Sequence, residues 1–496
     1  VDPEADRPRR RITAASVVVG AVLAVVAVVA GVDSILGPAA DDRGTRSDAA
    51  WDAYQSGLRA SEGVREDALD HLRRAIELDP GFAAAHAELA DFYDRQGATD
   101  LASATIDRAI ELAEDRSEVE RVRMLRLRAR IHEDLQAEEM WLRRLAVLDD
   151  DPEVRFDLAW FLFTHFRYCD EALVGIRGVL EVDPRPHFLL YLGEVAMSCG
   201  LADEALDALA RAVAARPDEA ALHGFRSYLQ RLAGDVEAAE RSAERALELA
   251  PDDPWIAHRQ ALVLHRRYRF DEALSAFRRA RGLQRGARGS AASAWAGEAI
   301  VHLDRARFTD TASRALDEAD EAADRILALV DPPSPEALAI RGLVDVARGD
   351  LVAARERLDT LDRHFESTTS RYDRHYRDQL RGRILGAEGR WRDAATAHAD
   401  AVRNRPLEAA DHRLALARAQ LGAGEIEEAV GGLYRLFDLD PNHAEGRCLA
   451  AEAHERAGRP RAAASEWDAC ARLADALAVD GLFTALESLA RTAPAP

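Results

Sequence analysis

From about residue 50 onward, the hydrophobic and polar positions of this 496-residue chain repeat as pairs of short amphipathic segments. A segment with small and large apolar residues is followed by a tight polar turn and a second segment that often stops at Asp-Pro or Arg-Pro. Examples of the second segment are REDALDHLRRAIELDP (65–80), LADEALDALARAVAARP (201–217) and YRFDEALSAFRRA (268–280). Apolar residues at this spacing predict α-helices, so the chain is predicted to be all-α.

Alanines in the second segments recur with a period close to 34 residues. The steps from Ala172 to Ala205, Ala239 and Ala273 are 33, 34 and 34 residues, and the same register contains Ala68, Ala102, Ala394, Ala429 and Ala463. A second small or branched residue usually follows seven positions later, on the same helix face, where a partner helix can approach closely. Prolines then end the second helices, at Pro80, Pro184, Pro217, Pro251, Pro406 and Pro441. This period predicts an array of two-helix repeats.

The array is predicted to extend over residues 50–330 and 334–475, with about twelve hairpins and an irregular joint near residues 330–335. The segment GLFTALESLA follows it, so residues 476–496 are assigned to a capping helix and a fraying tail.

One repeat carries a family pattern with particular clarity. Leu192 and Gly193 lie in its first helix. Its second helix has the large residue Leu209 between Ala205 and Ala212, and Pro217 ends that helix. The pattern resembles the tetratricopeptide repeat family. The resemblance implies a stack of helical hairpins, an α-α superhelix (solenoid) that binds protein or peptide partners.

The first fifty residues carry the targeting signals. Residues 12–32 contain no charge and are long enough for a helix that crosses a bilayer; residues 1–11 are a basic stub, and residues 33–49 read as a linker. Because arginines precede the apolar run and aspartates follow it, we expect the N-terminus in the cytoplasm and the array outside, at the cytoplasmic membrane. The alternative is a signal peptide cleaved near Pro38, which would make the array a secreted protein.

A second resemblance concerns the junction between this apolar run and the array. The basic stub, the apolar run and the segment AWDAYQSGLRAS are similar to the extracytoplasmic sensor part of bacterial membrane-bound winged-helix regulators and serine/threonine kinases. The chain begins with Val1, so either a GTG start codon was read literally or an upstream part is missing. The alternative function is therefore a sensor whose cytoplasmic output domain precedes Val1.

Charge changes the expected partners. The chain has 66 basic residues, all of them arginine, against 88 Asp and Glu, a formal net charge of -22. Such an acidic surface repels phosphate groups, so the array is not expected to bind nucleic acid. The expected partners are proteins or peptides, and the lipid bilayer through residues 12–32.

Motifs for catalysis are missing from the sequence. No HExxH, GxSxG, GxxxxGK[ST] or GxGxxG is present, so we expect no enzymatic activity, no cofactor and no metal. The four cysteines form no CxxC pair; Cys169 with Cys199, and Cys448 with Cys470, are placed either to form disulfides or to serve as small packing residues.

The tetratricopeptide resemblance also implies where partners bind, because fixed positions of the first helices line the inner groove in that family. Counting in register assigns ten residues to the groove, namely Asp91, Asp94, His187, Glu194, Tyr376, Gln379, Arg383, Arg418, Glu452 and Glu455. The groove is then acidic at both ends and basic towards the tenth repeat. A partner with alternating charge suits it.

Two arginine-rich stretches stand out, Arg266 to Arg288 and Arg371 to Arg383. Guanidinium groups bind carboxylates and phosphates bidentately, so each stretch is a candidate anion site. The alternative is a solvated helix face on which the arginines neutralise acidic neighbours.

Overall fold

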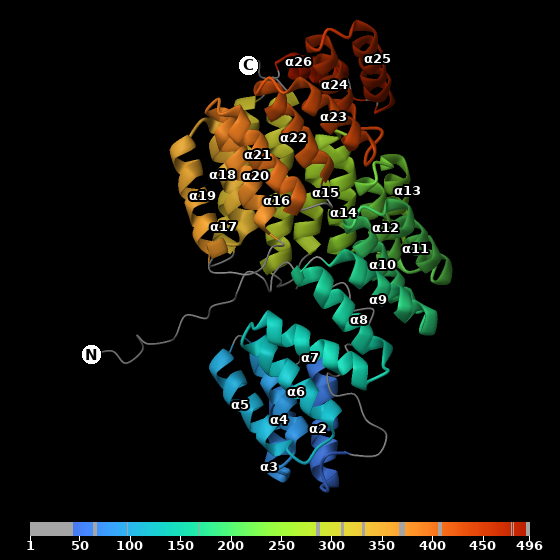
Figure 1. Ribbon diagram of the computed structural model, residues 1–496, viewed down its shortest axis with the longest axis vertical. Helices are drawn as coiled ribbons and strands as arrows, with labels where there is room; N and C mark the ends of the chain where they lie inside the picture. Colours follow the sequence, from blue (N-terminus) through green and yellow to red (C-terminus); the bar gives the residue numbers. More distant parts are fainter. Residues whose placement is uncertain are drawn as a thin grey trace, which may run out of the picture. The chain divides into compact units, whose positions relative to one another are not determined.

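The computed structural model describes residues 43–62, 67–96, 98–166, 168–283, 288–308, 312–329, 333–366, 373–404, 409–477, 479 and 481–492 (Figure 1). These residues form 25 α-helices, one short π-helix and no strand. The all-α prediction is therefore confirmed for the part of the chain that the structure describes.

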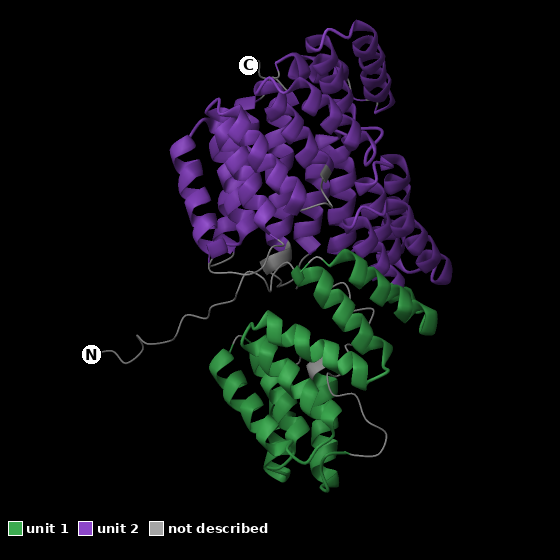
Figure 2. Cartoon of the chain, in the orientation of Figure 1, with its two compact units in different colours: residues 1–13, 22–188 green, residues 14–21, 189–496 purple. Residues whose placement is uncertain are grey.

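The chain divides into two compact units, whose described parts are residues 43–188 and 189–492 (Figure 2). Unit 1 contains α2 (Asp48–Glu62), α3 (Ala68–Leu78), α4 (Ala83–Arg95), α5 (Thr99–Leu112), α6 (Glu118–Ile131), α7 (Leu135–Leu148), α8 (Pro152–Phe161), the π-helix η1 (Leu162–Phe166) and α9 (Cys169–Val182). The division falls within α10 (Pro186–Ser198).

Unit 2 contains the remaining helices, which are α11 (Ala202–Ala215), α12 (Ala220–Leu232), α13 (Val236–Leu249), α14 (Pro254–Arg266), α15 (Phe270–Leu283), α16 (Arg288–Phe308), α17 (Ala312–Leu329), α18 (Pro335–Arg348), α19 (Leu351–Glu366), α20 (Arg374–Ala387), α21 (Trp391–Asn404), α22 (Ala409–Gly422), α23 (Ile426–Phe437), α24 (Ala444–Arg456), α25 (Pro460–Ala476) and α26 (Leu482–Arg491).

The helices form twelve successive hairpins, from α2 and α3 to α24 and α25, followed by α26, which packs on α24 and α25. The small residues predicted to face the partner helix are buried: Ala205, Ala212, Ala239 and Ala246 have no exposed surface. The second helices end before the prolines, for example α11 before Pro217. Helical periodicity and proline placement thus account for the local architecture.

The first helices of neighbouring hairpins contact one another. In unit 2 these contacts join α12 to α14, α14 to α16, α16 to α18, α18 to α20, and α22 to α24. Helices that touch their equivalents in the next hairpin lie on the concave side of a curved stack, where the spacing is smallest. We call the solvent-facing side chains of α10, α12, α14, α16, α18, α20, α22 and α24 the inner face of unit 2.

Unit 2 also closes on itself, since α26 packs against α16 and the C-terminal helices share a cluster with the turn after α14. Tyr268, in the turn after α14, shares one hydrophobic cluster with residues of α24, α25 and α26. The rings of Tyr268 and Phe308 meet edge to face with centroids 5.3 Å apart. Residues about 200 positions apart in sequence therefore share one core.

Two turn residues are shaped by this closure. Gly234 and Tyr268 occupy equivalent turns, and both have positive φ, 79° and 58°. A Cβ on Gly234 would lie 2.8 Å from the Cα of Asp440, so only glycine fits there. An aromatic residue in the left-handed region is strained, and the packing of Tyr268 on the C-terminal helices offsets that strain.

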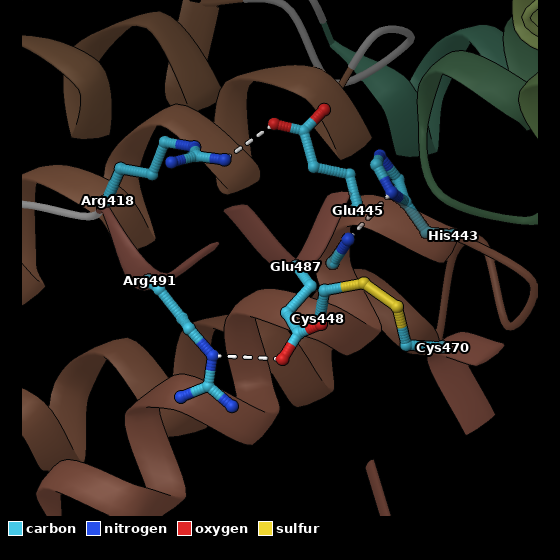
Figure 3. Close-up of a disulfide and its surroundings, with 8 residues drawn as sticks. Arg418, His443, Glu445, Cys448, Cys470, Glu487 and Arg491 are labelled. Carbon is cyan, nitrogen blue, oxygen red and sulfur yellow. Dashed lines mark hydrogen bonds and ion pairs between the residues drawn. A yellow bond between two sulfur atoms is a disulfide. The ribbon is translucent and has the colours of Figure 1, made fainter. Parts of the chain in front are cut away.

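A disulfide joins Cys448 of α24 to Cys470 of α25, with their Cα atoms 5.2 Å apart (Figure 3). Cys169 and Cys199 are also disulfide-bonded, so none of the four cysteines is a free thiol. The structure favours the bridged alternative for these residues.

Two expectations fall on residues outside the described part. No helix among the described residues is long and apolar enough to cross a membrane, and residues 12–32, which carry that prediction, are not described. Residues 330–332, at the expected joint in the array, are also outside it; α17 and α18, on either side, contact each other within unit 2.

The close approach of helices inside a hairpin generates a prediction about Gly193. A Cβ on Gly193 of α10 would lie 2.3 Å from Cδ2 of Leu209 on α11, so Gly193→Ala should lower the free energy of unfolding by about 1–3 kcal/mol. The control is Gly178→Ala in α9, where a Cβ meets nothing within 4 Å, and a gain of about 0.5–1 kcal/mol is expected. Urea unfolding monitored by circular dichroism measures both, and equal effects would contradict the packing argument.

Candidate functional site

The carboxylate of Glu445, in the first turn of α24, is the centre of a charged cluster in unit 2. It is 5% exposed. Nη2 of Arg418 donates a hydrogen bond to Oε1 of Glu445 at 2.7 Å (Figure 3), and Arg307 donates to the same oxygen. Burial alone would raise the pKa of Glu445, but the charges of Arg307 and Arg418 outweigh it and lower the pKa to about 2. Glu445 is therefore a buried, ionised carboxylate.

A second buried carboxylate, Asp440, lies in the turn before α24 and is 2% exposed. It forms an ion pair with Arg266, the last residue of α14. Burial opposes ionisation, but Arg266 and His443 outweigh it and hold the pKa of Asp440 below its usual range. Because Arg266 and Asp440 are 174 residues apart in unit 2, this pair fixes the closure electrostatically.

Further charges surround these two carboxylates. Asp304 of α16 accepts hydrogen bonds from Arg307, at 3.0 Å, and from Nε2 of His265, at 2.9 Å. Asp411 of α22 lies 3.8 Å from His443, and its side chain is 68% exposed. Desolvation by the surrounding protein would raise the pKa of Asp411, but His443 and Arg266 lower it well below its usual range. The cluster thus combines buried ion pairs with charges that face solvent.

Arg383 of α20 differs from the other arginines of the cluster. Its guanidinium forms no hydrogen bond or ion pair with the described residues, and its side chain is exposed. The surrounding protein, together with the charges of Arg307 and Arg418, lowers the pKa of Arg383 to about 10. It remains protonated at neutral pH without a carboxylate of its own.

Arg259 of α14 has a related setting. Its guanidinium lies 5.1 Å from the ring centroid of Phe225 and 4.9 Å from that of Tyr228, both on α12. Burial lowers the pKa of Arg259, and the charges of Tyr228 and Glu194 only partly oppose this effect. Arg259 and the two rings form an aromatic and cationic patch on the inner face.

The groove residues predicted in unit 1 lie within local ion pairs. Asp91 pairs with Arg130 and, at 3.0 Å, with Arg95, while Asp94 lies 3.4 Å from Nε of Arg130. His187 is 3.7 Å from Glu153. These acidic groups are therefore compensated by neighbouring basic side chains.

In unit 2 the predicted residues fall into separate groups. Glu194 lies near Arg259, and Arg383 and Arg418 belong to the charged cluster. Tyr376 packs against the core of α18 to α20, and Gln379 is half-buried on the same helix. Glu452 and Glu455 both lie near Arg491, at 3.9 Å and 3.2 Å. Within the predicted set, the structure brings Asp91 and Asp94 together at Arg130, and Glu452 and Glu455 together at Arg491.

Most arginines of the two basic stretches pair with acidic residues, as the solvated-face alternative predicts. Arg267 and Arg269 pair with Glu240, Arg278 and Arg281 with Glu298, and Arg377 and Arg381 with Asp362. Arg285 and Arg371 lie outside the described residues. Among the described residues of the second stretch, Arg383 is exposed and has no carboxylate partner, and Arg374 is half-buried without one.

Sequence reasoning missed the residues that organise the cluster, Glu445, Asp440 and Arg307. Glu445 is 138 residues from Arg307, and Asp440 is 174 residues from Arg266. Asp440 was recognised only as part of the Asp-Pro that ends a helix. No local pattern marks such distant partners.

The described residues contain no group of three or more His, Cys, Asp or Glu placed to hold a metal ion.

Comparison with known families identifies the repeat. Models of the family described as tetratricopeptide repeat match residues 60–130, 190–254 and 380–444. No curated protein sequence matches the chain.

Several solved structures are similar at low identity. A tetratricopeptide repeat protein from Parabacteroides merdae is 16% identical, with 51% of this chain and 93% of that chain covered and a TM-score of 0.38. Human IFIT1 with m7Gppp-AAAA is 14% identical over 79% of this chain and 90% of that chain, with a TM-score of 0.44. Yeast Tom70 is 14% identical over 88% and 98%, with a TM-score of 0.36. We draw no functional conclusion from similarity at this level.

Removal of the central carboxylate should destabilise unit 2. Glu445→Gln leaves Arg418 without a carboxylate partner and Arg307 with Asp304 alone, so we expect a loss of about 3 kcal/mol in the free energy of unfolding. Because the pKa of Glu445 is lowered, its contribution is complete above the ordinary pKa of Glu and is lost as the pH falls towards 2. Denaturant unfolding measures the loss, with the exposed Glu428→Gln as control, which should change stability by less than about 0.5 kcal/mol.

A buried histidine should make the protein sensitive to mild acid. His398 of α21 lies against Gly382, and burial, followed by the charges of Arg383 and His412, lowers its pKa to about 3. The unfolded chain binds a proton at His398 below about pH 6.5 and the folded chain does not, so stability should fall by about 1.4 kcal/mol per pH unit from there towards pH 3. Unfolding free energies at pH 6.5 and 5.0 should show a shallower slope in His398→Gln. An unchanged slope would exclude His398 as the cause.

Proposed function

Because the chain is built from tetratricopeptide repeats, we propose that it is a scaffold that binds protein or peptide partners on the inner face of unit 2. Proteins built from this repeat are generally non-catalytic scaffolds suited to protein–protein interaction. The observation that carries the proposal is that some arginines of that face have no carboxylate partner. Arg259 and Arg383 have no carboxylate partner among the described residues, whereas Arg266, Arg307 and Arg418 each pair with a carboxylate.

Aromatic and arginine side chains are the residue types that dominate binding energy at protein interfaces. Phe225, Tyr228 and Arg259 combine both on one patch, and the hairpin packing holds α12 against α14. A surface carried by packed helices is preorganised, which reduces the entropy lost on binding.

The location of the scaffold remains a proposal. The uncharged segment 12–32 and the arginines before it favour a membrane anchor with the array outside the cytoplasm. The disulfide between Cys448 and Cys470 supports an oxidising compartment, because such bonds persist there. Secretion after signal cleavage agrees with the same disulfide. The expected exclusion of nucleic acid also stays a prediction from the net charge.

Matched double variants test the binding face. The inner variant carries Tyr228→Ala and Arg259→Ala; the outer variant carries Tyr434→Ala and Arg435→Ala on α23, a second helix, and removes the same two residue types. The full chain and both variants are expressed in the native host, cross-linked and purified, and bound proteins are quantified by mass spectrometry. We expect the amount of each specific partner bound to the inner variant to fall about tenfold or more, because interface anchors contribute at least 1–2 kcal/mol each. Equal loss in both variants, or none in either, would contradict the assignment to the inner face.

A further inference from the structure

Two neighbouring helices of unit 1 expose large apolar side chains to solvent. Met140 and Val147 of α7 are 52% and 78% exposed, and Val174 and Val182 of α9 are 66% and 67% exposed. Both helices are second helices of their hairpins (Figure 1). The equivalent helix α13 of unit 2 exposes charged residues instead, namely Glu237, Arg241, Glu244 and Glu248. A solvated helix face is normally polar, so the four apolar residues indicate a surface that another molecule covers.

The exposed residues of each helix form one stripe. The two apolar residues of each helix are seven or eight positions apart, which places them on the same face two turns from each other. Arg143 lies midway along the stripe of α7. Gly178 lies midway along the stripe of α9, and a Cβ there would meet nothing within 4 Å, so this stripe is open. We call the following residues the α7–α9 patch: Met140, Arg143 and Val147 of α7, with Glu171, Val174 and Val182 of α9.

An ion pair fixes how the two stripes lie beside each other. Arg143 donates hydrogen bonds to both carboxylate oxygens of Glu171, and the distance from Nη2 to Oε2 is 3.0 Å. Because α7 and α9 are second helices of successive hairpins, they run in the same direction. Val147, one turn after Arg143, therefore lies beside Val174, about one turn after Glu171. The patch thus has an apolar level next to a level with one positive and one negative charge.

We propose that the α7–α9 patch binds a second copy of this chain, in a symmetric dimer in which α7 of each copy packs along α9 of the other. A two-fold axis that runs parallel to the two helices and between them places Arg143 of one copy opposite Glu171 of the other. The same axis places Val147 opposite Val174. Each contact occurs twice, as in any isologous interface. Opposite charges therefore meet, and so do apolar side chains, without a change in either copy.

The ion pair selects a second copy over a lipid surface. Bilayer hydrocarbon offers no partner to Arg143 and Glu171, so covering them with lipid costs free energy. A second copy supplies a carboxylate and a guanidinium at matching positions, so each charged group gains another partner of opposite sign. The neighbouring Arg144 lies on the other side of the stripe, where it pairs with Glu118 of α6.

The size of the patch sets the strength of the dimer. α7 and α9 each have 14 residues, which is about 21 Å of helix, and packed helices lie about 10 Å apart. Two such helices cover about 400 Å² on each copy, so the interface buries about 800 Å² in total, below the size of a standard stable complex. The dimer therefore dissociates at micromolar concentrations or above. The inference does not depend on the inner face of unit 2.

Charge reversal tests the pairing. Arg143→Glu makes both charges of the patch negative, and Glu171→Arg makes both positive, so each variant should self-associate about tenfold more weakly than wild type. An equimolar mixture of the two should associate like wild type, because the acidic patch of one copy then faces the basic patch of the other. Sedimentation velocity of the full chain in a mild detergent measures all four samples, up to about 100 μM. A wild type that stays monomeric, or a mixture no stronger than the separate variants, would overturn the proposal.

Cysteine cross-linking tests the geometry. All four native cysteines are disulfide-bonded, so an introduced cysteine is the only free thiol. Copies with Val147→Cys, mixed with copies with Val174→Cys, should cross-link on oxidation with copper phenanthroline. Each variant alone should cross-link much less, because α7 faces α9 and not α7. Val352→Cys on α19 is the control, since Val352 is 70% exposed and outside the patch. Equal yields from the mixture and from either variant alone would contradict this arrangement.

A third comparison separates the dimer from other uses of the patch. Val147→Asp should weaken self-association about tenfold and Val352→Asp should not, while both should melt like wild type because both positions are exposed. Self-association that Val147→Asp leaves intact would assign the contact to another part of the chain, such as residues 12–32. A monomeric wild type that binds phosphatidylcholine vesicles through Val147 would assign the patch to lipid. Either result would reject the dimer and leave the scaffold proposal standing, since that proposal is tested at Tyr228 and Arg259.

Discussion

The closed form of unit 2 depends on two buried carboxylates. Asp440 and Glu445 lie at the start of the last hairpin and pair with Arg266 and Arg307 from helices far earlier in the chain. A buried ion pair contributes little net stability, because desolvation offsets much of the attraction, but one partner left alone is strongly unfavourable. These pairs therefore act mainly by specifying which surfaces meet, while the apolar cluster around Tyr268 supplies the burial of hydrophobic area.

Closure also shapes the face that we assign to binding. The arginines that pair with Asp440 and Glu445 are held by the fold, whereas Arg383 is exposed and has no carboxylate partner among the described residues. A guanidinium without a carboxylate partner contributes no ion pair to the stability of the fold. Residues that lower stability in this way are commonly retained for binding.

Tyr268 illustrates how the tertiary structure overrides a local rule. The repeat places glycine in the equivalent turn, as at Gly234, because the backbone there has positive φ. Tyr268 adopts the same conformation despite its Cβ, and its ring packs between Phe308 and the C-terminal helices. The local strain is tolerated because the aromatic contact forms part of the closure.

The sequence by itself determined the repeat. The spacing of buried alanines, the prolines that end second helices and the family pattern around Gly193 predicted an all-α array of helical hairpins, since helical periodicity and helix termination depend on residues a few positions apart. It also assigned Arg383 and Arg418, with eight other residues, to the inner groove. Only the tertiary structure decided that Glu240 and Asp362 neutralise much of the basic stretches while Arg383 stays unpaired. The partner of each charge is set by the curvature and closure of the stacked hairpins, which pair Arg266 with Asp440 across 174 positions, and no local pattern encodes that geometry.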